Sequence, residues 1–287
     1  MMNELVLLHP LAAYILVGLF SLAVGSFLNV LIYRLPLMLY SEWRIECREH
    51  LQFPEEPEEA INLFYPRSFC PGCKKLISAW QNIPLFSYLF LRGRCGQCRQ
   101  HIPLRYPFVE ALCMSLSLFA AWHFGFTPTL IFALIFIWIL IGLFFIDLQH
   151  KLLPDGLSLS LLWLGLIANT QSLLTPLPVA VLSAVGAYLS LWLLIKIFYF
   201  CTGKIGMGNG DFKLFAAFGA WFGWTQLPLI LIFSSVSGAV IGLIYLQIAG
   251  KNRDTQIPFG PFLCVAGLVS LFYGKEIMDG YWMLMMR

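Results

Sequence analysis

Long apolar stretches alternate along the chain with short breaks rich in polar residues, glycine and proline. A helix needs about 20 mainly apolar residues to cross a bilayer, and somewhat fewer in a compact bundle. The fourth and sixth apolar stretches are short. The pattern predicts eight membrane-spanning helices, at about residues 10–33, 108–124, 129–147, 156–170, 177–200, 212–224, 227–248 and 258–274.

The composition agrees with this pattern. Hydrophobic residues make up 59% of the 287 residues and charged residues only 11%, whereas soluble domains carry roughly 25% charged residues. A soluble fold is therefore excluded, and we expect an all-α polytopic membrane protein. The first nine residues contain Glu4 and no Lys or Arg. A cleaved signal peptide begins with a basic region and has a shorter apolar run than the one that reaches Tyr33 here. The N-terminal segment is therefore expected to be a retained first span.

The charges cluster in one place. Ten of the 18 Lys and Arg residues lie between Arg34 and Arg105, together with seven Glu residues. Basic loops face the cytoplasm, so this insert is expected to be cytoplasmic and both termini to lie on the opposite side. The pattern predicts three parts: a first span at 1–36, a small domain at 37–107, and a seven-span membrane domain at 108–287.

Two aspartates stand out at the predicted cytoplasmic edge. Asp147 directly follows an apolar run, and Asp211 follows the glycine-rich loop 203–210. Ionisable groups at membrane depth are costly and are functional candidates by default. Two carboxyls brought together in a partly dry site cannot both ionise easily, so one can activate water while its protonated partner donates to a carbonyl. This is the chemistry of aspartyl proteolysis.

Simpler roles stay open for these residues. Asp211 stands where the N-cap of the sixth span is expected, and Asp155 where the N-cap of the fourth span is expected. Asp155 is also a rival for the second catalytic carboxylate. The glycines at 206, 208 and 210 allow the backbone to approach a partner or substrate closely, which favours a functional role for Asp211.

Four of the eight cysteines form two C-x-x-C pairs separated by 21 residues, Cys70 with Cys73 and Cys95 with Cys98. This spacing is close to that of zinc sites. Four thiolates close a tetrahedral structural zinc site and leave no open position for catalysis. The alternatives are reduced, unpaired thiols or disulfides, and a cytoplasmic location disfavours disulfides.

Several segments together resemble the bacterial type IV prepilin peptidases, which are GxGD aspartyl proteases. The resemblance covers about residues 10–270, and its motifs stand in the order found in that family. They are GSFLNVLIYRLP (25–36), CPGCKKLISAWQNIPLFSYLFLRGRCGQC (70–98), RYPFVE (105–110), FFIDLQHKLLPD (144–155) and GMGNGDFKLFAAFGAWFG (206–223).

The resemblance implies that Asp147 and Asp211 are the catalytic pair. Four further residues of these motifs are expected to support them: Gly208, Gly210, Lys213 and Asp155. The implied activity is removal of the basic leader from type IV prepilins or type II secretion pseudopilins, at the cytoplasmic face of the bacterial inner membrane. The new N-terminal amine would then be methylated with S-adenosylmethionine as donor.

Methyl transfer rests on the resemblance alone, because no glycine fingerprint of a nucleotide fold is present. Its site is expected at the membrane face of the insert, although the same residues could simply hold the insert against the first span. They are Asn29, Arg34, Trp80, Asn82 and Gly93. The acidic residues Glu55, Glu56, Glu58 and Glu59 match no motif of the family, and attraction of a basic leader is one hypothesis for them.

Two other classes of function stay open: a transporter or channel in which Asp147 and Asp211 relay protons, and a zinc-bearing scaffold without catalysis. The expected partners are prepilin or pseudopilin substrates and membrane lipid, with no nucleic acid. The sequence leaves the oligomeric state undetermined.

Overall fold

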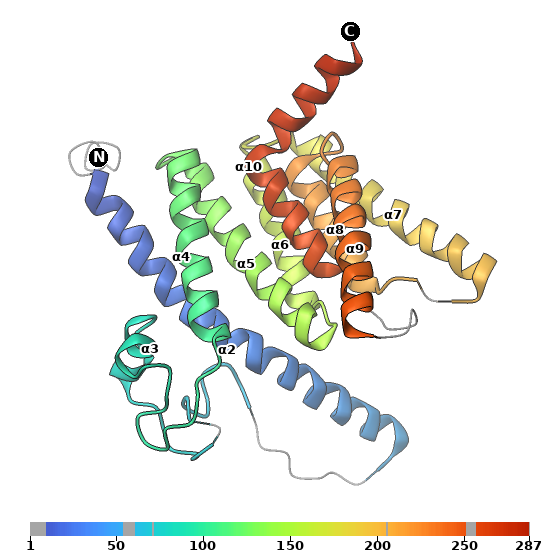
Figure 1. The fold of residues 1–287 in the computed structure, drawn as a ribbon. Coiled ribbons are helices and arrows are strands. Elements are labelled where there is room, and N and C mark those ends of the chain that lie inside the picture. The colour runs from blue at the N-terminus through green and yellow to red at the C-terminus, as the bar shows by residue number, and fades with distance from the viewer. Residues whose placement is uncertain (1–9, 54–60, 71, 205, 251–256, 287) are drawn as a thin grey trace. The chain divides into compact units, whose positions relative to one another are not determined.

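The computed structural model describes residues 10–53, 61–70, 72–204, 206–250 and 257–286. Within these residues the protein is almost entirely helical, without a β-strand (Figure 1). The chain forms two compact units, Met1–Phe126 and Thr127–Arg287. The expectation of an all-α protein with a cysteine-bearing insert after the first span is confirmed. Glu4, Lys251, Arg253 and the acidic residues 55–59 lie outside the described residues.

The first unit is built on two long helices, α2 (Pro10–Leu51) and α4 (Arg105–Phe124). Between them lie the short 3₁₀ helix η1 (Ala79–Asn82) and the helix α3 (Phe86–Phe90). The expected end of the first span near residue 33 is not the end of the helix. Residues 37–51 contain no Gly or Pro, and their good helix formers continue α2 past Pro36.

The second unit is a bundle of six helices. Their bounds are α5 (Pro128–His150), α6 (Asp155–Asn169), α7 (Leu177–Thr202), α8 (Asn209–Phe222), α9 (Leu227–Ala249) and α10 (Gly260–Met285). A helix therefore stands at each of the eight predicted places. Six helices of the described chain are long and apolar enough to cross a membrane, and α6 and α8 are too short to do so alone.

The short helix α8 lies at the centre of this bundle and packs on α6, α7, α9 and α10. All of its residues from Asp211 to Phe222 are buried except Lys213. A Cβ at Gly219 would lie 2.5 Å from the backbone oxygen of Ser183, so α7 and α8 approach closely at this glycine. Membrane helices associate through such close packing, since lipid gives little hydrophobic drive between them.

A buried amide side chain pairs the last carbonyl groups of the short helix α8. The Nδ2 of Asn169, at the end of α6, donates to the carbonyl oxygens of Ala220 and Trp221 at 2.8 and 3.1 Å. The last carbonyls of a helix have no partner within the helix and are costly to bury unpaired. Asn169 thus allows α8 to end inside the bundle, and this end of α8 sets the position of its other end, where Asp211 lies.

Candidate active site and metal centre

Asp147 and Asp211 come from helix ends that are far apart in sequence. Asp147 lies in the last turn of α5, where Lys151 N–H donates to its carbonyl oxygen at 2.9 Å. Asp211 lies in the first turn of α8. Their residues are 5% and 8% exposed, and the two carboxyls interact electrostatically. The structure therefore brings the two predicted aspartates to one buried place.

The start of α10 also lies beside the two aspartates. The backbone N–H of Gly260 donates a hydrogen bond to the Asp147 carboxylate. A Cβ at position 260 would lie 2.6 Å from Asp147 Oδ2, so any side chain here would displace this carboxylate. Cys264, one turn further along α10, is buried and interacts electrostatically with both aspartates.

Sequence reasoning missed Gly260 and Cys264. The Gly-Pro pair at 260–261 is a recognisable start of a helix, and a helix N-terminus is a good neighbour for a carboxylate. The Gly-Pro pair predicts that a helix begins here, but it does not predict which carboxylate lies beside the start of that helix.

The predicted supporting glycines surround Asp211. The backbone N–H of Gly208 donates to the Asp211 carboxylate, and Gly208 is also the N-cap of α8. A Cβ at Gly210 would lie 2.7 Å from the Cβ of Leu153. The segment that follows Asp147 therefore packs directly on the glycine loop that precedes Asp211. Asp211 Oδ1 is buried without a hydrogen-bond partner among the described residues.

The two N-cap interpretations are wrong. Gly208, not Asp211, is the N-cap of α8, and Asp211 lies three residues inside the helix. Pro154, not Asp155, is the N-cap of α6. The reason is that the glycine loop and Leu153-Pro154 supply the extended backbone that each helix start needs.

Asp155 instead pairs with Lys213. The Nζ of Lys213 lies 2.6 Å from Asp155 Oδ1, and the Asp155 side chain is 59% exposed. The pair joins the start of α6 to the first turn of α8. Exposed pairs of this kind contribute little to stability, so we assign Asp155 a supporting position rather than a share in a buried dyad.

Four of the six cysteines of the first unit form one cluster. The Sγ atoms of Cys70, Cys73, Cys95 and Cys98 all lie within 4.8 Å of one another. Zn–S bonds of about 2.3 Å in a tetrahedron place the sulfurs about 3.8 Å apart, and Cys70 Sγ lies 3.8 Å from Cys98 Sγ. The cluster therefore fits a metal ion such as zinc.

The two C-x-x-C loops have the same backbone geometry. In the first, Lys74 N–H donates to Cys70 O at 2.8 Å, and in the second, Arg99 N–H donates to Cys95 O at 3.0 Å. Lys74 and Arg99 both have positive φ, of 60° and 61°. Backbone N–H groups of Cys98 and Gln97 donate to the Cys95 sulfur and lower the pKa of this thiol to about 6. Such donors suit the thiolate that binds zinc.

The metal site gives a direct prediction. Replacing Cys70 with Ser removes one of four ligands, so the zinc bound per chain is expected to fall from about one to well below one after dialysis against a weak chelator. Elemental analysis of the purified protein measures this. Cys47→Ser is the matched control, because Cys47 is an exposed cysteine outside the cluster. Full zinc content in the Cys70→Ser protein would contradict the assignment.

The residues expected to bind the methyl donor differ in their burial and in their contacts. Asn29 is buried, and its Nδ2 donates to Tyr106 O at 3.0 Å. The buried Arg34 donates to the carbonyl oxygens of Asn62, Leu63 and Pro66 at 2.9, 3.3 and 2.5 Å. Both side chains thus connect α2 to other parts of the first unit.

The remaining three of these residues lie in the insert. Trp80 is 55% exposed and lines an open hollow. Gly93 has a φ of +68° and follows the end of α3, and the side chain of Asn82 lies outside the described part of the chain. A shared methyl-donor site for these five residues stays a prediction.

Known proteins resemble the chain over almost its whole length. The profile of the bacterial peptidase A24 N-terminal domain matches residues 19–124, and that of the type IV leader peptidase family matches residues 134–243. The chain belongs to the type IV leader peptidase family. The two matched regions fall one in each compact unit.

Curated members of the type IV leader peptidase family align end to end. One from Legionella pneumophila is 61% identical over 287 residues, which cover 99% of this chain and 100% of the relative. Others from Stutzerimonas stutzeri and Pseudomonas aeruginosa are each 48% identical over 274 residues, with 95% of this chain covered and 95% and 94% of the relatives. Each is named "Prepilin leader peptidase/N-methyltransferase". No solved structure matches.

The predicted family is therefore confirmed, and the chain is a multi-pass membrane enzyme of an aspartic peptidase family. Membership in a peptidase family disfavours both the transporter and the scaffold without catalysis.

Proposed function

We propose that the protein cleaves the basic leader from type IV prepilins or type II secretion pseudopilins and then methylates the new N-terminus. The pairing of two buried carboxyls in the unit that matches the leader peptidase profile carries this proposal. The names of the relatives support both activities.

The proposed cleavage uses Asp147 and Asp211 as a dyad. One carboxylate takes a proton from water, and the resulting hydroxide attacks the scissile carbonyl while the other, protonated carboxyl donates to its oxygen. The tetrahedral intermediate then breaks its C–N bond, and the leaving amine receives a proton from the dyad. The unpartnered Oδ1 of Asp211 is free to hold the water, and Gly260 N–H orients Asp147.

The proposed location follows from the substrate. A prepilin has a short basic leader followed by a long apolar helix, so its scissile bond lies at headgroup level. The aspartates lie at helix ends, which suits that depth. The basic loops support a position of these ends at the cytoplasmic face of the inner membrane, with both termini periplasmic.

For methyl transfer, S-adenosylmethionine would give up its S-methyl group to the neutral N-terminal amine and leave as S-adenosylhomocysteine, and the methylated amine would lose a proton. Asn29, Arg34, Trp80, Asn82 and Gly93 are the proposed site. Asn29 offers one feature that suits a ligand, since its Oδ1 is buried without a hydrogen-bond partner among the described residues. An acceptor there fits an N–H or O–H of the donor or of the substrate.

The proposal predicts two separate mass changes. The purified protein, incubated with a prepilin in detergent, is expected to release the leader and leave a mature chain. Adding S-adenosylmethionine then adds the mass of one methyl group to the mature chain only. Intact-protein mass spectrometry follows both steps. An uncleaved prepilin contradicts the peptidase proposal, and cleavage without methylation contradicts the second activity alone.

A further inference from the structure

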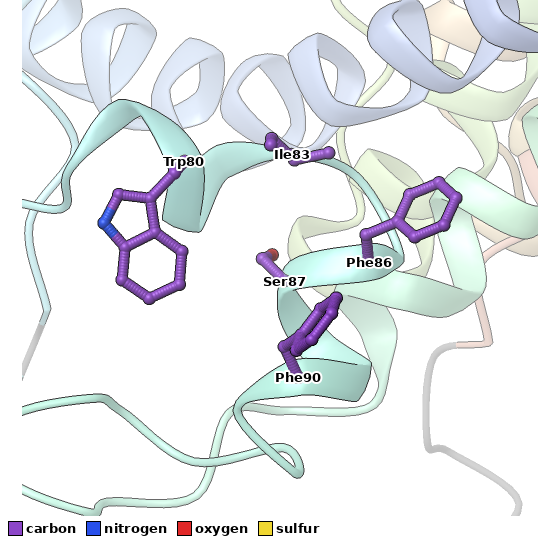
Figure 2. A pocket seen from close by; sticks show the side chains of 5 residues that line it. All are labelled: Trp80, Ile83, Phe86, Ser87 and Phe90. Atoms are coloured by element: carbon purple, nitrogen blue, oxygen red, sulfur yellow. The ribbon is translucent and has the colours of Figure 1, made fainter.

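An exposed aromatic surface covers η1 and α3 in the first unit. Trp80, Ile83, Phe86, Leu89 and Phe90 are 55%, 48%, 55%, 71% and 83% exposed. Four of them, with Ser87, line an open hollow of about 270 Å³ (Figure 2). A water-exposed domain rarely presents so many large apolar side chains together, and such a patch marks an interaction site.

The charged residues of the segment that carries this aromatic surface all have one sign. Between residues 61 and 104 the sequence contains no Asp or Glu. The same segment carries six exposed basic residues, Arg67, Lys74, Lys75, Arg92, Arg94 and Arg99. A tetrathiolate zinc site has a net charge of about −2, which leaves the segment positive. A partner for this surface must be apolar in part and anionic in part.

The contact between α3 and the membrane helix α4 indicates which kind of partner this surface can meet. Leu85 N–H, at the N-cap of α3, donates to Glu110 Oε2 at 2.9 Å. Glu110 is buried, and a Cβ at Gly25 of α2 would lie 2.9 Å from its Cα. Position 110 lies five residues, or about 7.5 Å, inside α4. The start of α3 is therefore held beside the beginning of the membrane-spanning helices.

We propose that the aromatic surface inserts into the interfacial region of an anionic membrane leaflet. Phe86 and Phe90 would enter the boundary between headgroups and acyl chains, as aromatic residues at membrane interfaces do. The basic residues around them would contact lipid phosphates.

A photocrosslink at position 90 tests the contact in the full chain. Phe90 is replaced by benzoylphenylalanine, and the protein is reconstituted into vesicles that contain phosphatidylglycerol. We expect a covalent adduct with the mass of one lipid, as also expected for the same label at Leu16, an exposed position of the spanning helix α2. An adduct with a second protein chain, or none when Leu16 labels lipid, would overturn the proposal.

The charge requirement is tested in the same assay. In vesicles with phosphatidylglycerol, the adduct yield at position 90 is expected to be severalfold higher than in purely zwitterionic vesicles. Combining Arg92→Gln with Arg94→Gln should remove most of this difference, while the yield at Leu16 stays constant. Equal yields in the two lipids would show that the leaflet need not be anionic and would refute this part of the proposal.

Discussion

Asp147→Asn and Asp211→Asn are each expected to abolish prepilin cleavage. Asparagine keeps the size of the side chain but can neither accept a proton from water nor donate a carboxyl proton to the scissile carbonyl. Because the two carboxyls act as one unit, either loss should lower the cleavage rate by several orders of magnitude. The measurement is the rate of leader release under single-turnover conditions.

Two controls separate a catalytic loss from a folding defect. The unfolding temperature in detergent should not fall, since replacing a buried carboxyl with a neutral amide removes a costly group from an apolar site. Asp155→Asn should retain most of the activity, because Asp155 is exposed and paired with Lys213. Substantial cleavage by either Asp147→Asn or Asp211→Asn would refute the dyad, and loss of cleavage in Asp155→Asn alone would favour the rival.

Local sequence was enough to predict the helices, because the membrane requires long apolar runs and the breaks between them are visible as glycine, proline and charge. It was incomplete where a helix extends beyond its membrane span or is buried within the bundle. The helix α2 continues to Leu51 through a charged segment, which hydropathy reads as a loop. The helix α8 is short and buried among other helices, and Asn169, which pairs its last carbonyls, comes from a different helix.

The candidate site, too, was only partly predictable from the sequence. Asp147, Asp211 and the four cysteines were predictable because their chemistry is unusual for their surroundings: carboxyls at a membrane edge, and thiols at metal-ligand spacing. Gly260 and Cys264 have no such mark in the sequence. Their proximity to the aspartates depends on how α10 packs on α5 and α8, which is a property of the tertiary structure.

Gly260→Ala is expected to reduce the cleavage rate by about 100-fold or more. The added Cβ would lie 2.6 Å from Asp147 Oδ2 and 3.1 Å from Leu153 Cδ2, so the carboxylate must move away from the Gly260 N–H that orients it. Misplacing a catalytic group by about 1 Å can cost roughly 100-fold in rate. The loss should appear in kcat, with little change in the KM for prepilin.

The same helix provides the control for this variant. Gly280→Ala introduces a Cβ into α10 at a place where nothing lies within 4 Å apart from its chain neighbours and the backbone of its own helix, so its cleavage rate should equal that of the unchanged protein. Gly280 lies inside α10 and Gly260 is its first residue, so Gly280→Ala raises helix propensity at least as much as Gly260→Ala. Slower cleavage by Gly260→Ala alone therefore reports the contact with Asp147 rather than a general effect of adding a methyl group to α10. If Gly260→Ala cleaves prepilin as fast as Gly280→Ala, the position of Asp147 does not depend on this glycine, and Gly260 only begins the helix.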